Sequence, residues 1–146
     1  SLPFVDASRI GIAGWSYGGY ETLMAISDPA SPFKAAVAIA PVTSWRYYDT
    51  VYAERYMLTP GENEEGYRTS APIERVDNVE CSLLMMHGTA DDNVHLSNTI
   101  EYVSRLQESG RVCDMLLFPN MNHSINGCDA RALVYGRMVG YFTRNL

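Results

Sequence analysis

Three kinds of side chain stand in this sequence in an order that suits nucleophilic catalysis. Ser16 lies in the segment GWSYG, residues 14–18, which is a G-x-S-x-G pattern. In this pattern a sharp turn from strand to helix holds the serine in a strained conformation with its hydroxyl exposed. The backbone N–H of Tyr17 can then serve as one donor to an oxyanion. The pattern indicates a nucleophilic serine that would attack a carbonyl group.

A serine hydroxyl needs a histidine base, and the base needs an orienting acid. Asp91 and Asp92 follow an apolar run in MMHGTADDNVH, and His123 follows another in FPNMNHSI. The order serine, acid, histidine is that of α/β-hydrolases. By local chemistry either aspartate can be the acid, so both stay open at this point. The order favours His123 as the base.

The other histidines and the cysteines have simpler interpretations. His87 ends an apolar run and precedes the acid, so we interpret it as a hydrogen-bonded structural histidine. His95 begins a helical pattern and is expected at the surface or beside the site. The cysteines are odd in number and lack metal-site spacing, so we expect neutral thiols at Cys81, Cys113 and Cys128.

Short apolar segments alternate with helical patterns, which predicts an α/β fold with a mostly parallel sheet of about four strands. The runs lack polar alternation, as in strands covered on both faces. The expected strands are 9–13, 35–40, 81–86 and 115–118. The loops that follow the first, third and fourth strands carry the candidate serine, acid and base. Open α/β sheets carry their sites at this carboxyl edge.

Three helical segments are expected to cover this sheet. They are residues 17–27, 96–107 and 130–145. The second has an apolar face made of Leu96, Ile100, Val103 and Leu106, and the third has one made of Leu133, Val134, Met138 and Phe142.

The segment 43–78 interrupts the alternation. Aromatic residues recur there at spacings of three and four, which predicts one helix carrying Trp45, Tyr48, Tyr52 and Tyr56 on one face. The stretch TPGENEEGY that follows predicts an exposed loop. The aromatic face either packs into a core or walls a pocket for a compact ring, and the pattern alone leaves both open.

Composition suits one globular domain, although 146 residues is short for an α/β enzyme. The formal net charge of −6, from 11 basic and 17 acidic residues, argues against binding to nucleic acid or anionic membranes. No segment is long and apolar enough to span a membrane, and the opening SLPFVDAS is unlike a signal peptide.

Taken together, GWSYGGY, APVTSWRYYDTVYAERYM, HGTADDNVH and NHSI resemble the catalytic domain of dipeptidyl peptidases of the prolyl oligopeptidase family of serine peptidases. The resemblance covers essentially the whole chain, in order. It implies the C-terminal part of an α/β-hydrolase fold and acyl transfer through an acyl-enzyme, with no metal or organic cofactor. It also implies Ser16 as nucleophile, His123 as base and Asp91, rather than Asp92, as the acid.

The resemblance further implies a peptide substrate with proline, or less well alanine, as its second residue. Cleavage after that residue releases an N-terminal dipeptide. Asn93 matches the residue that hydrogen-bonds the carbonyl of the substrate's first residue. The positions that match the pocket for proline are Tyr17, Val42, Trp45, Tyr48, Tyr52 and Val94. A secreted or periplasmic location follows from the resemblance alone.

Members of the family carry a β-propeller and the front of the hydrolase domain upstream, including a tyrosine that completes the oxyanion hole. The sequence contains neither, so we expect residues 1–146 to form a single partial hydrolase domain with low or no turnover by itself. The strand at Ile10–Ile12 would then lie at a sheet edge. We expect self-association there, for example as a homodimer.

Two other functions stay open. An esterase or lipase with the same serine, acid and base would need a pocket for an acyl chain, which the aromatic set with Asn93 disfavours. A non-catalytic product would fold and self-associate without reacting at Ser16.

Overall fold

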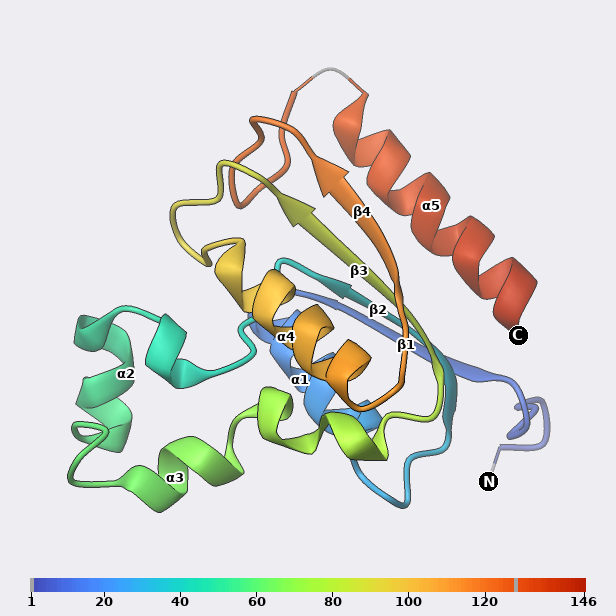
Figure 1. Cartoon of the computed structure of the whole chain (residues 1–146). Helices are drawn as coiled ribbons and strands as arrows, with labels where there is room; N and C mark the ends of the chain where they lie inside the picture. The colour runs from blue at the N-terminus through green and yellow to red at the C-terminus, as the bar shows by residue number, and fades with distance from the viewer. Residues whose placement is uncertain (1, 128) are drawn as a thin grey trace.

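A wholly parallel sheet organises the chain. The structure is a computed structural model that describes residues 2–127 and 129–146, so the expectation for Cys128 lies outside the described residues. In these ranges the sheet has four strands in the spatial order β1-β2-β3-β4. They are β1 (Ile10–Trp15), β2 (Phe33–Ile39), β3 (Ser82–Gly88) and β4 (Asp114–Phe118) (Figure 1). The predicted parallel sheet is confirmed, with strand boundaries displaced by at most two residues.

The helices lie between and after the strands. They are α1 (Tyr17–Ile26), α2 (Thr50–Met57), α3 (Glu64–Thr69), α4 (Ser97–Glu108) and α5 (Ala130–Asn145). Short 3-10 turns occur at Trp45–Tyr47 and Pro72–Asn78. The three helices expected to cover the sheet are confirmed, and α5 has the predicted bounds.

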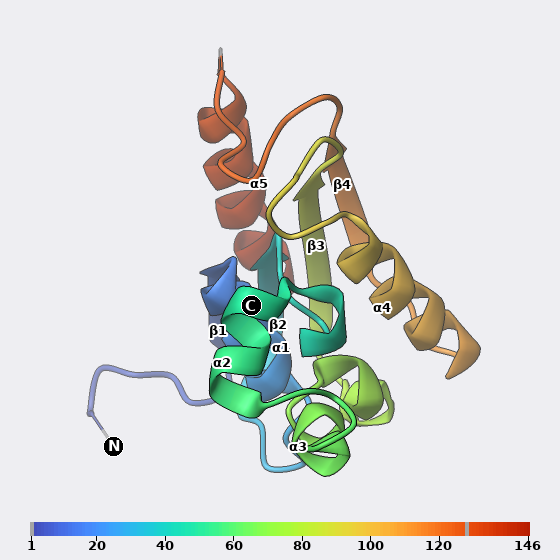
Figure 2. The same cartoon turned by 90° about the vertical axis from the view of Figure 1, so that its left-hand side faces the viewer.

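Alternate side chains of the central strands enter two separate cores. Ala36 and Ala38 of β2 pack with α1 and α4 on one face, whereas Val37 and Ile39 pack against α5 on the other. Figure 2 shows the sheet between α5 and α4. The central strands β2 and β3 are therefore covered on both faces, as their unbroken apolar runs predict.

The buried faces of α4 and α5 differ in part from the apolar faces read from the sequence. Ile100 is 42% exposed and Leu133 is 52% exposed. In α4 the polar residues Asn98 and Thr99 are buried instead, because both hydrogen-bond to groups beyond the helix. The buried face of α4 therefore includes Asn98 and Thr99 and leaves Ile100, a residue of the predicted apolar face, exposed.

The expectation of one helix through the aromatic residues 45–56 is wrong. A 3-10 turn at Trp45–Tyr47 ends at Tyr48, which is extended, and α2 then starts after Asp49. The carboxylate of Asp49 accepts a hydrogen bond from the N–H of Tyr52, which is a helix N-cap. The chain therefore turns between the 3-10 turn and α2, yet the rings of Trp45, Tyr48 and Tyr52 still pack against one another.

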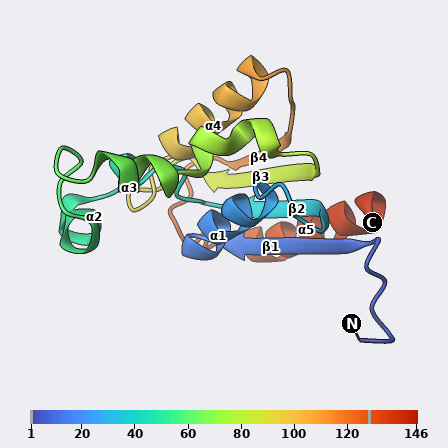
Figure 3. The same ribbon diagram turned by 90° about the horizontal axis from the view of Figure 1, so that it is seen from below.

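The stretch 59–67 is also not an exposed loop throughout. Asn63 accepts a hydrogen bond from the N–H of Gly66 and caps α3, whose first turn holds two glutamates. Tyr67 is buried, and its hydroxyl donates to the carbonyl of Leu58. Figure 3 shows α2 and α3 beyond the carboxyl ends of the strands, on the side where the loops of the site gather.

The strand β1 lies at one edge of the sheet. Among the described residues it pairs with β2 alone, through partners such as Ile12 with Ala36. This is the edge at which the sequence predicts self-association. In the same described ranges, no helix combines the length and apolarity that a membrane crossing needs.

Candidate active site

The turn from β1 into α1 presents the hydroxyl of Ser16. Ser16 has φ 59° and ψ −117°, a strained backbone conformation for a residue with a side chain, and its N–H donates to the carbonyl of Ile39 at 2.8 Å. A Cβ at Gly14 would clash with the backbone carbonyl of Gly18, whereas a Cβ at Gly18 would meet nothing within 4 Å, so the close backbone approach requires glycine at position 14. The amide of Tyr17 begins α1, where helix N–H groups lack intrahelical partners. The local geometry is that of a nucleophile elbow.

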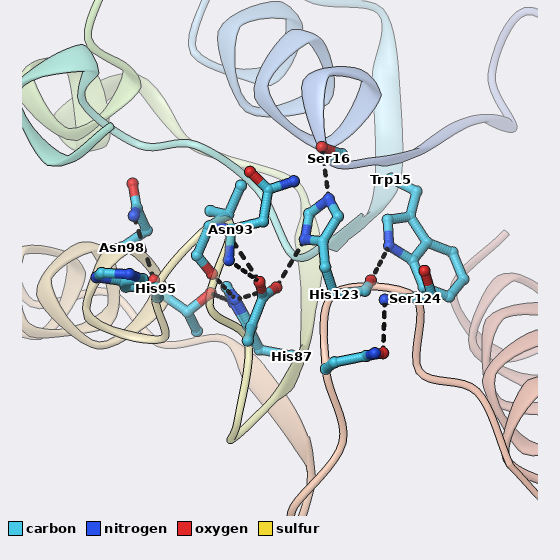
Figure 4. A network of polar contacts seen from close by, with 12 residues as sticks. Trp15, Ser16, His87, Asn93, His95, Asn98, His123 and Ser124 are labelled. Carbon is cyan, nitrogen blue, oxygen red and sulfur yellow. Dashed lines mark hydrogen bonds and ion pairs between the residues drawn. The ribbon is translucent and has the colours of Figure 1, made fainter. Parts of the chain in front are cut away.

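The imidazole of His123 joins the serine to a carboxylate (Figure 4). Its Nε2 lies 2.8 Å from Oγ of Ser16, and its Nδ1 lies 2.7 Å from Oδ2 of Asp91. Because a carboxylate accepts, Nδ1 carries the proton in the neutral ring and Nε2 is free to accept from the serine hydroxyl. This tautomer is the one that a general base needs.

The carboxylate of Asp91 is buried and fully hydrogen-bonded. The side chain of Asp91 has no exposed surface, and its Oδ1 accepts the backbone N–H groups of Asn93 and Val94, each at 3.0 Å. Its neighbour Asp92 is exposed. Of the two aspartates that local chemistry leaves open, the structure brings Asp91 to His123.

The loop that carries His123 is held by contacts that the sequence does not reveal. The indole N–H of Trp15 donates to the carbonyl of His123 at 3.0 Å. Arg131 lies over the Trp15 ring, 5.2 Å from its centroid, and its Nε donates to the carbonyl of Ser124 at 3.2 Å. Trp15 precedes the serine, so one residue of the elbow also fixes the histidine loop.

His87 is the hydrogen-bonded histidine that the sequence predicts, with an additional contact. Its ring bonds to Thr99 and to the carbonyl of Val94. It also lies 3.2 Å from the carboxylate of Asp91, which sequence reasoning missed. His95 is exposed, as expected.

The aromatic residues form a small cavity beside Ser16. Its volume is about 180 Å³, and it is lined by Ser16, Tyr17, Val42, Trp45, Tyr48 and Tyr52. Trp45 is nearly buried and packs at 5.8–5.9 Å from the rings of Tyr48 and Tyr52. Val94 belongs to the same buried cluster. The aromatic set therefore does both things that the pattern allowed, packing a core and walling a pocket.

Asn93 is tied to this pocket. The hydroxyl of Tyr48 donates to Oδ1 of Asn93 at 2.8 Å. Burial, followed by the negative charge of Asp49, raises the pKa of Tyr48, so this hydroxyl keeps its proton at neutral pH. With Oδ1 engaged, the amide NH₂ of Asn93 remains as a donor.

A second cavity, of about 400 Å³, shares several of these aromatic residues. Its lining is Tyr17, Tyr20, Trp45, Tyr52, Ala53, Tyr56, Met57 and Ser70. Sequence reasoning missed the part played by Tyr20, which is buried and stacks edge-on against Trp45 at 5.0 Å. Its position one helical turn after Ser16 is the signal that places it there.

The cysteines described by the structure show no sign of reactivity. Burial raises the pKa of the Cys81 and Cys113 thiols to about 11, so both are neutral at pH 7 as predicted. In the described part of the chain, no three His, Cys, Asp or Glu side chains gather in a way that could hold a metal ion.

A parallel sheet flanked by helices, with an elbow after one strand, defines the fold as that of an α/β-hydrolase. The model of the prolyl oligopeptidase family matches residues 1–146. The chain therefore belongs to the prolyl oligopeptidase family of peptidases, as the sequence resemblance implies.

Named relatives agree with this assignment. A protein of Ajellomyces capsulatus named "Probable dipeptidyl-aminopeptidase B" is 46% identical over 144 residues, which are 95% of this chain and 16% of the relative. The crystal structure of Porphyromonas gingivalis dipeptidyl peptidase 4 matches with a TM-score of 0.96 at 46% identity, covering 99% of this chain and 21% of that one. A Bacteroides ovatus structure matches with a TM-score of 0.95 at 34% identity and covers 99% of this chain. The chain thus spans about a sixth of the length of the curated relative.

Proposed function

We propose that this chain carries the catalytic residues of a serine-type dipeptidyl peptidase, which cleaves after a second residue that is proline or, less well, alanine. The observation that carries the proposal is the hydrogen-bonded line from Ser16 through His123 to Asp91, next to an aromatic cavity. The names of the relatives support the release of dipeptides, and the preference for proline comes from the resemblance of the sequence.

In the proposed reaction, Oγ of Ser16 attacks the carbonyl carbon of the substrate's second residue while Nε2 of His123 takes the hydroxyl proton. The oxyanion receives the backbone N–H of Tyr17. His123 then gives its proton to the leaving amine, which departs as the acyl-enzyme forms. Water repeats the sequence with His123 as base and releases the dipeptide acid. Asp91 stays ionised and holds the imidazolium.

The cavity explains the proposed preference for proline. Its volume of about 180 Å³ and its aromatic walls suit a compact ring and leave little room for a long side chain. The free NH₂ of Asn93 is the proposed donor to the carbonyl of the first substrate residue.

The test uses irreversible dipeptidyl phosphonates, which form one bond to the serine and need no turnover. The purified chain is incubated with alanyl-prolyl and alanyl-leucyl phosphonates of the same leaving group, and modified protein is followed by intact mass. We expect faster modification by the prolyl compound. Equal rates, together with ready hydrolysis of p-nitrophenyl butyrate, would contradict the peptidase proposal and favour an esterase.

A further inference from the structure

His87 is a buried histidine that the proposed reaction does not use. It is the sixth residue of β3, its side chain has no exposed surface, and it lies directly below the loop 91–94. That loop carries the proposed acid and, next to it, Asn93 and Val94. The contacts of His87 can therefore affect the position of the Asp91 carboxylate.

The partners of His87 determine which nitrogen carries its proton. Nε2 lies 2.8 Å from the carbonyl oxygen of Val94, which can only accept, so Nε2 is protonated. Nδ1 lies 2.8 Å from Oγ1 of Thr99 in α4, whose hydroxyl can donate to it. Both ring nitrogens are satisfied by a neutral ring in one tautomer.

Burial supports the neutral form. It lowers the pKa of His87, and this effect exceeds the opposing effects of the Val94 carbonyl and the Asp91 carboxylate. The titratable groups that act on the ring are Asp91, in the loop after β3, and His123, in the loop after β4. The contact from α4, through Thr99, is uncharged.

The protonated Nε2 also faces the carboxylate. It lies 3.2 Å from Oδ2 of Asp91, the oxygen that accepts from His123 at 2.7 Å. The N–H of Nε2 therefore hydrogen-bonds to the Val94 carbonyl and lies in close contact with this oxygen. Oδ1 accepts two backbone N–H groups, so His123 and His87 are the side chains that approach Oδ2.

We propose that His87 is the positioning residue of the acid: its neutral Nε2–H binds the Val94 carbonyl, lies against Oδ2 of Asp91, and so fixes the carboxylate toward His123. This inference rests on the proposed function, because it assigns His87 a part in activating Ser16. A donor on Oδ2 also weakens the hold of the carboxylate on the imidazolium of His123. His87 therefore sets the pH at which the base becomes free.

The first test measures directly which ring nitrogen of His87 is protonated in the wild-type chain. The chain has 3 histidines, so ¹H–¹⁵N spectra of the imidazoles can be assigned with single His→Gln variants. We expect His87 to show a protonated Nε2 and an unprotonated Nδ1 at neutral pH, as its two hydrogen-bond partners require. A protonated Nδ1, or an unprotonated Nε2, would overturn the proposal.

The second test compares His87→Phe, which removes the donor, with His87→Gln, which keeps an N–H near the position of Nε2. The readout is the pH at which modification of Ser16 by an alkyl fluorophosphonate reaches half its maximal rate. We expect His87→Phe to raise this midpoint by about 0.5 pH or more and to lower the plateau. We expect His87→Gln to return the midpoint toward wild type. His95→Gln serves as the control and should leave it unchanged.

The outcomes distinguish failure of the proposed function from failure of the positioning role of His87. A wild-type chain that never reacts at Ser16 would contradict the proposed function, while the imidazole spectra would still test His87. A reactive chain whose midpoint is the same in the wild type and in His87→Phe would overturn the positioning role alone. If His87→Phe does not fold, the wild-type spectra and the Gln variant still decide.

Discussion

Nε2 of His123 lies 2.8 Å from Oγ of Ser16, although 107 residues separate them in the sequence. Ser16 follows β1 and His123 follows β4, the two outer strands of the described sheet. Three strand spacings, roughly 14 Å, lie between those strands. The loop after β4 must therefore reach back across the sheet, and the bond from the Trp15 indole to the His123 carbonyl holds it there.

Asp91→Asn should slow fluorophosphonate modification of Ser16 by about 10³- to 10⁴-fold. The amide can keep its oxygen on the N–H groups of Asn93 and Val94, but its NH₂ then faces Nδ1–H of His123, which forces the wrong tautomer. The matched control is Asp92→Asn at the exposed neighbouring position, which should react at the wild-type rate. Equal loss in both variants would contradict the assignment of the acid.

Gly14→Ala should lower the free energy of unfolding by about 2–4 kcal/mol and abolish reaction at Ser16. The added Cβ meets the Gly18 carbonyl at 1.9 Å, and neither backbone segment can move without opening the elbow. The control is Gly136→Ala in α5, where a Cβ meets nothing within 4 Å. We expect that change to stabilise the chain by about 0.5–1 kcal/mol in urea titrations. Similar effects at both positions would argue against the tight crossing.

Tyr48→Phe should weaken reaction with the alanyl-prolyl phosphonate by about 5-fold, the value of one hydrogen bond of about 1 kcal/mol. The ring and the cavity remain, so the preference for prolyl over leucyl compounds should persist. Tyr48→Ala removes a wall and should reduce that preference as well. Tyr47→Phe, at an exposed tyrosine, is the control. A Phe variant that behaves as wild type would contradict a role for the bond to Asn93.

Self-association through β1 stays a prediction from the sequence. Static light scattering at micromolar concentration should give a mass above that of the monomer, because the outer edge of β1 has no partner strand in the described residues. A charge at the exposed edge position, Ala13→Lys, should reduce this mass. The control, Val112→Lys, places the same charge at an exposed site before β4. A monomeric wild-type chain would rule the prediction out.

The sequence predicted the sheet because β2 and β3 are unbroken apolar runs, and it predicted α5 because its apolar residues recur at helical spacing. It missed the break in the helix at Tyr48, because the aromatic periodicity continues across the N-cap formed by Asp49. It missed the α3 helix because Asn63 caps a segment rich in loop-forming residues.

The candidate site could be predicted as far as residue types and order allow. Ser16 and His123 stand out by chain order, whereas the choice of Asp91 over Asp92 needed the family resemblance. The contact of His87 with Asp91 depends on how the loop after β3 folds back onto the end of the strand, which residue types and spacing do not specify. The same holds for the Trp15 bond across 108 residues.

Modification of the wild-type chain by an alkyl fluorophosphonate, followed by peptide mapping, tests most directly whether Ser16, His123 and Asp91 form an active nucleophilic site. The assembled serine, histidine and aspartate predict one adduct per chain, on Ser16, which is lost in Ser16→Ala and strongly slowed in His123→Ala. A folded wild-type chain that stays unmodified, or an adduct that persists in Ser16→Ala, would contradict the role of Ser16 as an activated nucleophile.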